Sequence, residues 1–142
     1  MSTGLTSARG VLDDRAALVA WFDRTRARSA SPFDMIDDEA YYTRPIALRH
    51  PIVFYEGHLP AFAVNVLIKK GLGRPGVDER LERLFARGID PHSADAAERT
   101  AAETRALWPS RAEVKDYVAR ADALLRSALR DETLVRDDVP VL

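Results

Sequence analysis

The segment 51–69 constrains the fold most, because it is apolar around nearly its whole circumference when it is wound as a helix. A helix of this kind is buried among its neighbours and does not lie on a surface. Pro51 suits a first helical turn and marks the start. Pro60 removes a backbone donor within the helix, so we expect a kink between Glu56 and Pro60, eased by Gly57.

Two further long segments have one apolar side each. The first runs from Asp13 to about Ser29. The second follows a capping box, S-R-A-E, which spans Ser110 to Glu113 and opens the clearest amphipathic helix in the chain. The expected apolar stripe of this helix consists of Val114, Tyr117, Val118, Ala121, Leu124, Leu125 and Ala128.

Shorter elements complete the expected organisation. We predict one helical turn at 38–42, short helices at 77–88 and 94–108, and a helix end at the glycine- and proline-rich stretch GLGRPG, 71–76. No segment shows the alternation of a strand, so the sequence predicts an all-α fold.

Three long helices with wide apolar faces predict an up-and-down bundle, and such bundles usually close with a fourth helix. After Asp131 only ETLVRDDVPVL remains in the sequence, which is too short to match the other helices. We therefore expect an incomplete bundle at 11–131, a flexible N-terminus at 1–10 and a C-terminal tail at 132–142.

Composition excludes several classes of protein. The absence of cysteine rules out disulfides, thiolate zinc sites and a cysteine nucleophile. A net charge of -1 argues against a nucleic-acid partner, and the only basic run, Arg24, Arg26 and Arg28, is interpreted as a solvated helix end in preference to an anion site. No apolar run approaches the roughly 20 residues of a membrane span. We expect no membrane partner and a cytoplasmic protein.

His58 is the candidate functional residue of the buried segment. On a helical wheel it lies with Phe54, Tyr55, Ala61 and Phe62 and therefore faces inward, whereas Glu56 is rotated about 160° away and cannot share a site with it. A buried imidazole needs a partner, which is a hydrogen-bonding group or a metal. For a lone histidine, the hydrogen-bonded core residue is the commoner case.

Other polar and aromatic residues have simpler interpretations. Asn65 lies on the His58 side of the helix, where we expect it to orient the imidazole. Tyr55 and Phe62 are interpreted as core residues in preference to a substrate pocket. The acidic residues at 13–14 and 37–39 are interpreted as capping or solvated charges, and no catalytic or substrate-binding residue is assigned.

The stretch YYTRPIALRHPIVFYEGHLPAF, 41–62, resembles the second-helix region of the DinB-like bundle in ergothioneine-biosynthesis sulfoxide synthases. Two flanking pieces agree in order, RTRARS and WPSRAEVKDYVARAD, so that the resemblance covers roughly 12–129. The proline, apolar and aromatic run that ends in Gly57 and His58 is its most specific part.

The resemblance implies a non-heme iron enzyme that uses oxygen to join a thiol sulfur to the imidazole of trimethylated histidine. His58 inherits the position of one of three iron(II) ligands. The other two ligands belong to an H-x-x-x-H-x-E motif in the family's fourth helix, which this sequence lacks. His50 and His92 each lack a histidine four residues away, and no ligand role is assigned to either.

The resemblance also implies a C-terminal domain that this sequence does not contain. We therefore expect a fragment or a natural truncation that is inactive alone and holds no iron by itself. The expected partners are the missing C-terminal part or a second copy, and thiol and trimethylhistidine in the complete enzyme.

Two alternatives remain open. In the first, the chain would be a stand-alone helical interaction module whose open groove takes a partner helix or a second copy. In the second, it would be a metal-dependent thiol transferase of the wider DinB-like group, and the missing metal ligands count against this alternative too.

Overall fold

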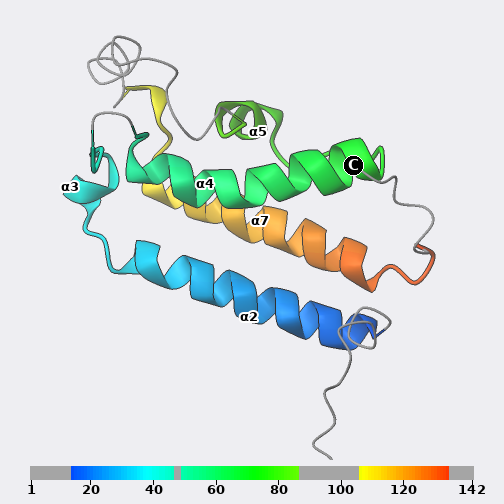
Figure 1. Ribbon diagram of the computed structural model, residues 1–142. Helices are drawn as coiled ribbons and strands as arrows, with labels where there is room; N and C mark the ends of the chain where they lie inside the picture. Colours follow the sequence, from blue (N-terminus) through cyan, green and yellow to red (C-terminus); the bar gives the residue numbers. More distant parts are fainter. Residues whose placement is uncertain (1–13, 47–48, 87–105, 135–142) are drawn as a thin grey trace, which may run out of the picture.

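The computed structural model describes residues 14–46, 49–86 and 106–134, and these form helices with no strand among them (Figure 1). The prediction of an all-α helical bundle is confirmed. The helices are α2 (Arg15–Asp34), α3 (Asp38–Tyr41), α4 (Ile52–Ala63), η1 (Val64–Gly71), α5 (Glu79–Leu84) and α7 (Arg111–Arg130).

Some predictions lie outside the described residues. These are the flexible segment 1–10, His92, most of the helix expected at 94–108, and the tail beyond residue 134. The division of the chain at 11–131 stays a prediction. Within the described residues, none of the helices combines the length and the apolar character that crossing a membrane requires.

Helix α7 lies between α2 and α4 and packs on both (Figure 1). It runs antiparallel to α2, since residues later in α2 form ion pairs with residues earlier in α7. Side chains of α2 and α7 are joined in three such pairs, Asp23 with Arg126, Arg26 with Asp122, and Asp34 with Lys115.

Helix α7 runs parallel to α4, which refines the expected up-and-down order. Lys115, near the start of α7, lies 3.7 Å from Glu56 near the start of α4, and Arg74 beyond η1 pairs with Asp131 beyond α7. The connection from 72 to 110 is long enough to bring the chain back to its starting end before α7 begins.

Side-chain caps fix where the helices begin. Asp14, Asp37, Asp78 and Ser110 each accept a hydrogen bond from a backbone N–H in the first turn of α2, α3, α5 and α7 respectively. Only half of the predicted capping box forms, because the Glu113 carboxylate pairs with Arg80.

Helix α2 continues five residues past the expected end at Ser29, to Asp34. Arg111 explains the extension, because its guanidinium donates to the Phe33 and Ile36 carbonyls at 2.6 and 2.8 Å and so caps the C-terminus of α2 from another helix. The basic run 24–28 therefore lies inside a helix and not at its end, so that part of the prediction was wrong. Arg24 and Arg28 are exposed to solvent as predicted, whereas Arg26 pairs with Asp122 in a largely buried contact.

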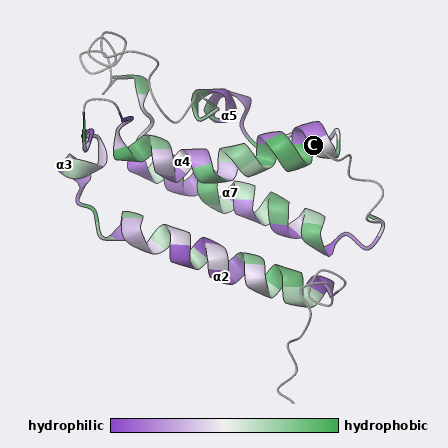
Figure 2. Cartoon of the chain, viewed as in Figure 1, coloured by the Kyte–Doolittle hydropathy of each residue, from purple (hydrophilic) through white to green (hydrophobic). Residues whose placement is uncertain are grey.

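Helix α4 is continuous through Pro60, so the structure assigns no break at 56–60. The change comes at Val64, where η1 takes up π-helical hydrogen bonding over two turns. As predicted, the helix ends at the glycine-rich stretch, where Gly73 adopts a left-handed φ of 63°. Figure 2 shows hydrophobic residues along both α4 and η1.

The core is formed by the inner faces of α3, α4, η1, α5 and α7, together with Trp108 before α7. The stripe predicted for α7 is confirmed, since its seven residues are all buried or packed against the core. The fully or almost fully buried hydrophobic residues are Tyr41, Val53, Phe54, Ala61, Val64, Ile68, Leu81, Phe85, Trp108, Val114, Tyr117, Ala121 and Leu125.

Two buried tyrosines differ in how their hydroxyls are satisfied. The Tyr41 hydroxyl donates to the buried Glu56 carboxylate at 2.6 Å, and the Arg111 guanidinium lies 4.7 Å above the Tyr41 ring centroid. The Tyr117 hydroxyl is buried and has no hydrogen-bond partner among the residues that the structure describes. Burial raises the pKa of both phenols well above the usual value, and the adjacent carboxylate of Glu56 adds to the rise in the pKa of Tyr41.

This contrast predicts opposite effects for one chemical change. Tyr41→Phe should lower the free energy of unfolding by about 2 kcal/mol, because a buried carboxylate loses its donor. Tyr117→Phe should be neutral or raise that free energy by about 1 kcal/mol, because it removes an unsatisfied hydroxyl. Urea unfolding of both variants checks this, and a loss of stability in Tyr117→Phe equal to that in Tyr41→Phe would contradict it.

The raised pKa values also predict an alkaline loss of stability. Above about pH 10 the tyrosines of the unfolded chain lose their protons, while Tyr41 and Tyr117 in the folded chain keep theirs. The folded state then binds more protons, so stability falls as pH rises, by about 1.4 kcal/mol per pH unit for each tyrosine. Unfolding measured from pH 9 to 11 should show a shallower fall in either Tyr→Phe variant than in the wild type.

Candidate functional site

His58 lies in the second turn of α4, at the edge of its buried face, and is half-buried. Its Nδ1 is 2.7 Å from the backbone carbonyl oxygen of Phe85, which follows α5. A carbonyl oxygen can only accept a hydrogen bond, so Nδ1 carries the proton. In the neutral imidazole this leaves the lone pair on Nε2, which is the form in which an imidazole binds a metal.

Aromatic rings hold the imidazole on both sides along the helix. The ring of Phe54 stacks on His58 with centroids 5.0 Å apart and an interplanar angle of 24°, and Phe62 lies at 6.0 Å. His50 packs on Phe54, with centroids 4.2 Å apart, and near Trp108. Since His50 is only 7% exposed among these rings, it is a core residue of the bundle.

Glu56 belongs to a separate cluster, as the helical wheel predicted. Its carboxylate is buried and contacts Tyr41 of α3 and Lys115 of α7, and no direct contact with His58 is among those recorded for the described residues. Glu56, two residues before the histidine in sequence, therefore joins α3, α4 and α7.

The prediction that Asn65 orients the His58 imidazole was wrong. Asn65 donates from Nδ2 to the carbonyl of Glu82 at 3.2 Å, and the partner of the imidazole is the Phe85 carbonyl. Sequence reasoning missed Phe85 because the acceptor is a backbone atom 27 residues away, and every residue type carries a carbonyl.

Phe62 is also misplaced by the helical wheel. Its side chain is 59% exposed, whereas Tyr55 is half-buried and packs against the core as expected. The buried face of α4 is centred near Gly57 and Ala61, so residues on the far side of His58 reach solvent. This places His58 at the border between core and solvent.

The described residues do not contain a complete three-ligand metal site. His58 offers a neutral imidazole with an anchored ring, but residues 14–46, 49–86 and 106–134 contain no group of three histidine, aspartate or glutamate side chains with metal-binding geometry. A catalytic iron centre commonly uses three protein ligands with further positions open. No reaction step is assigned to this part of the chain alone.

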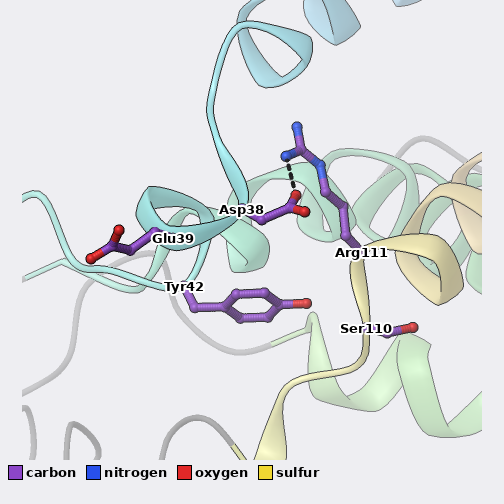
Figure 3. A pocket seen from close by; sticks show the side chains of 5 residues that line it. All are labelled: Asp38, Glu39, Tyr42, Ser110 and Arg111. Carbon is purple, nitrogen blue, oxygen red and sulfur yellow. Dashed lines mark hydrogen bonds and ion pairs between the residues drawn. The ribbon is translucent and has the colours of Figure 1, made fainter.

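A separate surface pocket of about 420 Å³ lies where α3 meets the start of α7 (Figure 3). Its polar groups already serve the fold. The Arg111 guanidinium pairs with Asp38 at 2.8 Å, the Tyr42 hydroxyl donates to the Pro109 carbonyl, and Ser110 caps α7. Asp38 and Glu39 were interpreted as capping or solvated charges, and the pairing of Asp38 holds α3 to α7.

Comparison with known proteins identifies the family. The family model of the DinB superfamily matches residues 21–139. Ergothioneine biosynthesis protein 1 of Neurospora crassa is 32% identical over 122 residues, which are 84% of this chain and 13% of that protein. The protein of the same name from Schizosaccharomyces pombe is 32% identical over 85 residues, 58% of this chain and 11% of its own length. The chain thus spans a small part of these curated relatives, and by its family match and its helical bundle it belongs to the DinB superfamily.

Proposed function

We propose that this chain is the iron-ligand-bearing DinB-like part of an ergothioneine-type sulfoxide synthase. Such an enzyme uses oxygen to join a thiol sulfur to the imidazole of trimethylhistidine. The observation that carries the proposal is the hydrogen bond from His58 Nδ1 to the Phe85 carbonyl, which leaves Nε2 free at the border of the core. Two relatives named for ergothioneine biosynthesis support it.

In this proposal, His58 holds one coordination position through Nε2, and the remaining ligands come from outside the described residues. Iron(II), when bound, would activate the oxygen that the reaction uses. The chain's own contribution is positional, because stacking on Phe54 and the bond to Phe85 hold the imidazole in one orientation. One imidazole is a weak site, so this part of the chain is inactive alone and binds the thiol and trimethylhistidine only in the complete enzyme.

A second candidate function rests on exposed apolar side chains along the outer side of α4 and η1. Leu59, Phe62 and Leu67 are 42%, 59% and 46% exposed. This strip of three residues would suit self-association with a second copy as a helical interaction module. The third reading, a metal-dependent thiol transferase, has no structural observation in its favour.

Iron titration tests the leading proposal. We expect the protein with its natural flanking segments to bind iron(II) under anaerobic conditions, measured by calorimetry. His58→Gln should weaken binding by more than tenfold, because the loss of a ligand exceeds the loss of a ligand's hydrogen-bond partner. Glutamine keeps an amide donor for the Phe85 carbonyl, so this variant isolates the missing nitrogen ligand.

His50→Gln is the matched control, since His50 is a buried histidine of the same segment that packs on the same phenylalanine. It should leave iron affinity unchanged. Equal affinities in the wild type and in His58→Gln would show that His58 is not a ligand.

Solution mass tests the second candidate. If the strip pairs with a second copy, sedimentation at about 100 μM should show a dimer, and Phe62→Gln should shift it to monomer. Leu107→Gln, at a side chain that is 49% exposed and outside the strip, should leave the dimer intact. A monomer in the wild type would remove the basis for an interaction module that pairs with itself.

A further inference from the structure

We propose that Gly57 and Phe85 are positioning residues for His58, and that α5 is the element which fixes the tautomer of the imidazole. Phe85 lies against the bare backbone of Gly57, and its carbonyl oxygen accepts a hydrogen bond from His58 Nδ1–H. This inference deepens the proposed function. It rests on that function only for the claim that iron binds at Nε2; the position of the proton on Nδ1 does not depend on it.

The first step is the contact between Gly57 and Phe85. A Cβ atom at position 57 would lie 2.3 Å from the ring of Phe85, which is too close for non-bonded carbon atoms, so one of the two residues would have to move. The ring of Phe85 is fully buried, so it has little room to retreat. It stacks near Trp108 and Tyr117, with centroids 6.2 and 6.1 Å away.

The second step links this contact to the imidazole. The ring that touches Gly57 and the carbonyl that accepts from His58 belong to the same residue, so displacement of the ring displaces the acceptor. At 2.7 Å the hydrogen bond is already short, and a shift of about 1 Å would take it beyond the usual range. Without this acceptor, the tautomer with the proton on Nδ1 is no longer favoured over the one with the proton on Nε2.

The third step is the anchoring of α5. The last carbonyls of a helix have no partner within it, and here two carbonyls at the end of α5 are met by side chains of α4 and η1. Asn65 donates to the Glu82 carbonyl at 3.2 Å, while His58 donates to the Phe85 carbonyl at 2.7 Å. These two bonds set both the position and the rotation of α5.

A buried carboxylate at the start of α5 completes the support. The Glu82 side chain is fully buried and accepts from the backbone N–H groups of Val77 and Asp78, at 2.8 and 3.1 Å. Lys69 of η1 lies 3.2 Å from the same carboxylate. Both ends of α5 are therefore held by polar contacts, and the helix cannot move away from α4 as a unit. A side chain added at Gly57 would then displace Phe85 itself, including its carbonyl group.

The test reads the tautomer directly in the iron-free protein. Two-dimensional NMR of protein with ¹⁵N-labelled histidine, at about pH 8 where an ordinary imidazole is neutral, distinguishes Nδ1–H from Nε2–H. His58→Gln assigns the signal. The wild type should show Nδ1–H, and Gly57→Ala should shift the signal to Nε2–H or to a mixture. Phe85→Leu keeps the backbone acceptor and should retain Nδ1–H.

The double variant Gly57→Ala with Phe85→Leu is the rescue, because a smaller side chain leaves space for the new Cβ. It should restore Nδ1–H, and it decides the matter if Gly57→Ala alone fails to fold. Iron(II) affinity of the protein with its natural flanking segments should fall about tenfold in Gly57→Ala and recover in the double variant.

Nε2–H in the wild type, an unchanged tautomer in folded Gly57→Ala, or a double variant without Nδ1–H would each overturn the positioning role. Failure of the proposed function looks different. In that case His58→Gln leaves iron affinity unchanged, while the tautomer still responds to Gly57→Ala.

Discussion

Burial of one apolar helix governs the rest of this structure. Helix α4 has hydrophobic residues on nearly every side, and its continuation η1 has one apolar face. Their burial stabilises the fold by about 25 cal/mol per Å² of apolar surface, and it requires other elements to cover them. Helix α7 covers the main face, and α5 and α3 cover the flanks. The coverage ends at Leu59 and Phe62, which reach solvent, and His58 lies at that border. An imidazole at such a border can be anchored from the core and still present a nitrogen outward.

Polar groups decide how the covering elements fit. Arg111 joins three elements, since it caps α2, pairs with Asp38 of α3 and lies over the Tyr41 ring. Two buried carboxylates, Glu56 and Glu82, each accept a hydrogen bond from another helix, from Tyr41 of α3 and Lys69 of η1 respectively. Buried charges of this kind add little net stability, but leaving one unpaired is costly, so they favour one arrangement of the helices over others.

The sequence contains the local part of this fold. Periodicity and capping residues predict the helices and the stripe of α7, because both depend on neighbours within a few residues. The end of α2 was not predictable in this way, since its carbonyls are capped by Arg111 from a distant helix. The exposure of Phe62 failed for a similar reason, because a wheel gives relative angles and not the direction of the neighbouring helices. The same holds for the candidate site. The sequence identifies His58 as a candidate, whereas its hydrogen-bond acceptor at Phe85 is seen only in the structure.

The central claim is that His58 Nε2 binds iron. It is tested most directly by a crystal structure of the protein with its natural flanking segments, loaded anaerobically with iron(II), with anomalous data at the iron edge. We predict an anomalous peak within bonding distance of His58 Nε2, with Nδ1 still hydrogen-bonded to the Phe85 carbonyl. An iron peak at other ligands, with His58 Nε2 outside bonding distance, would contradict the claim.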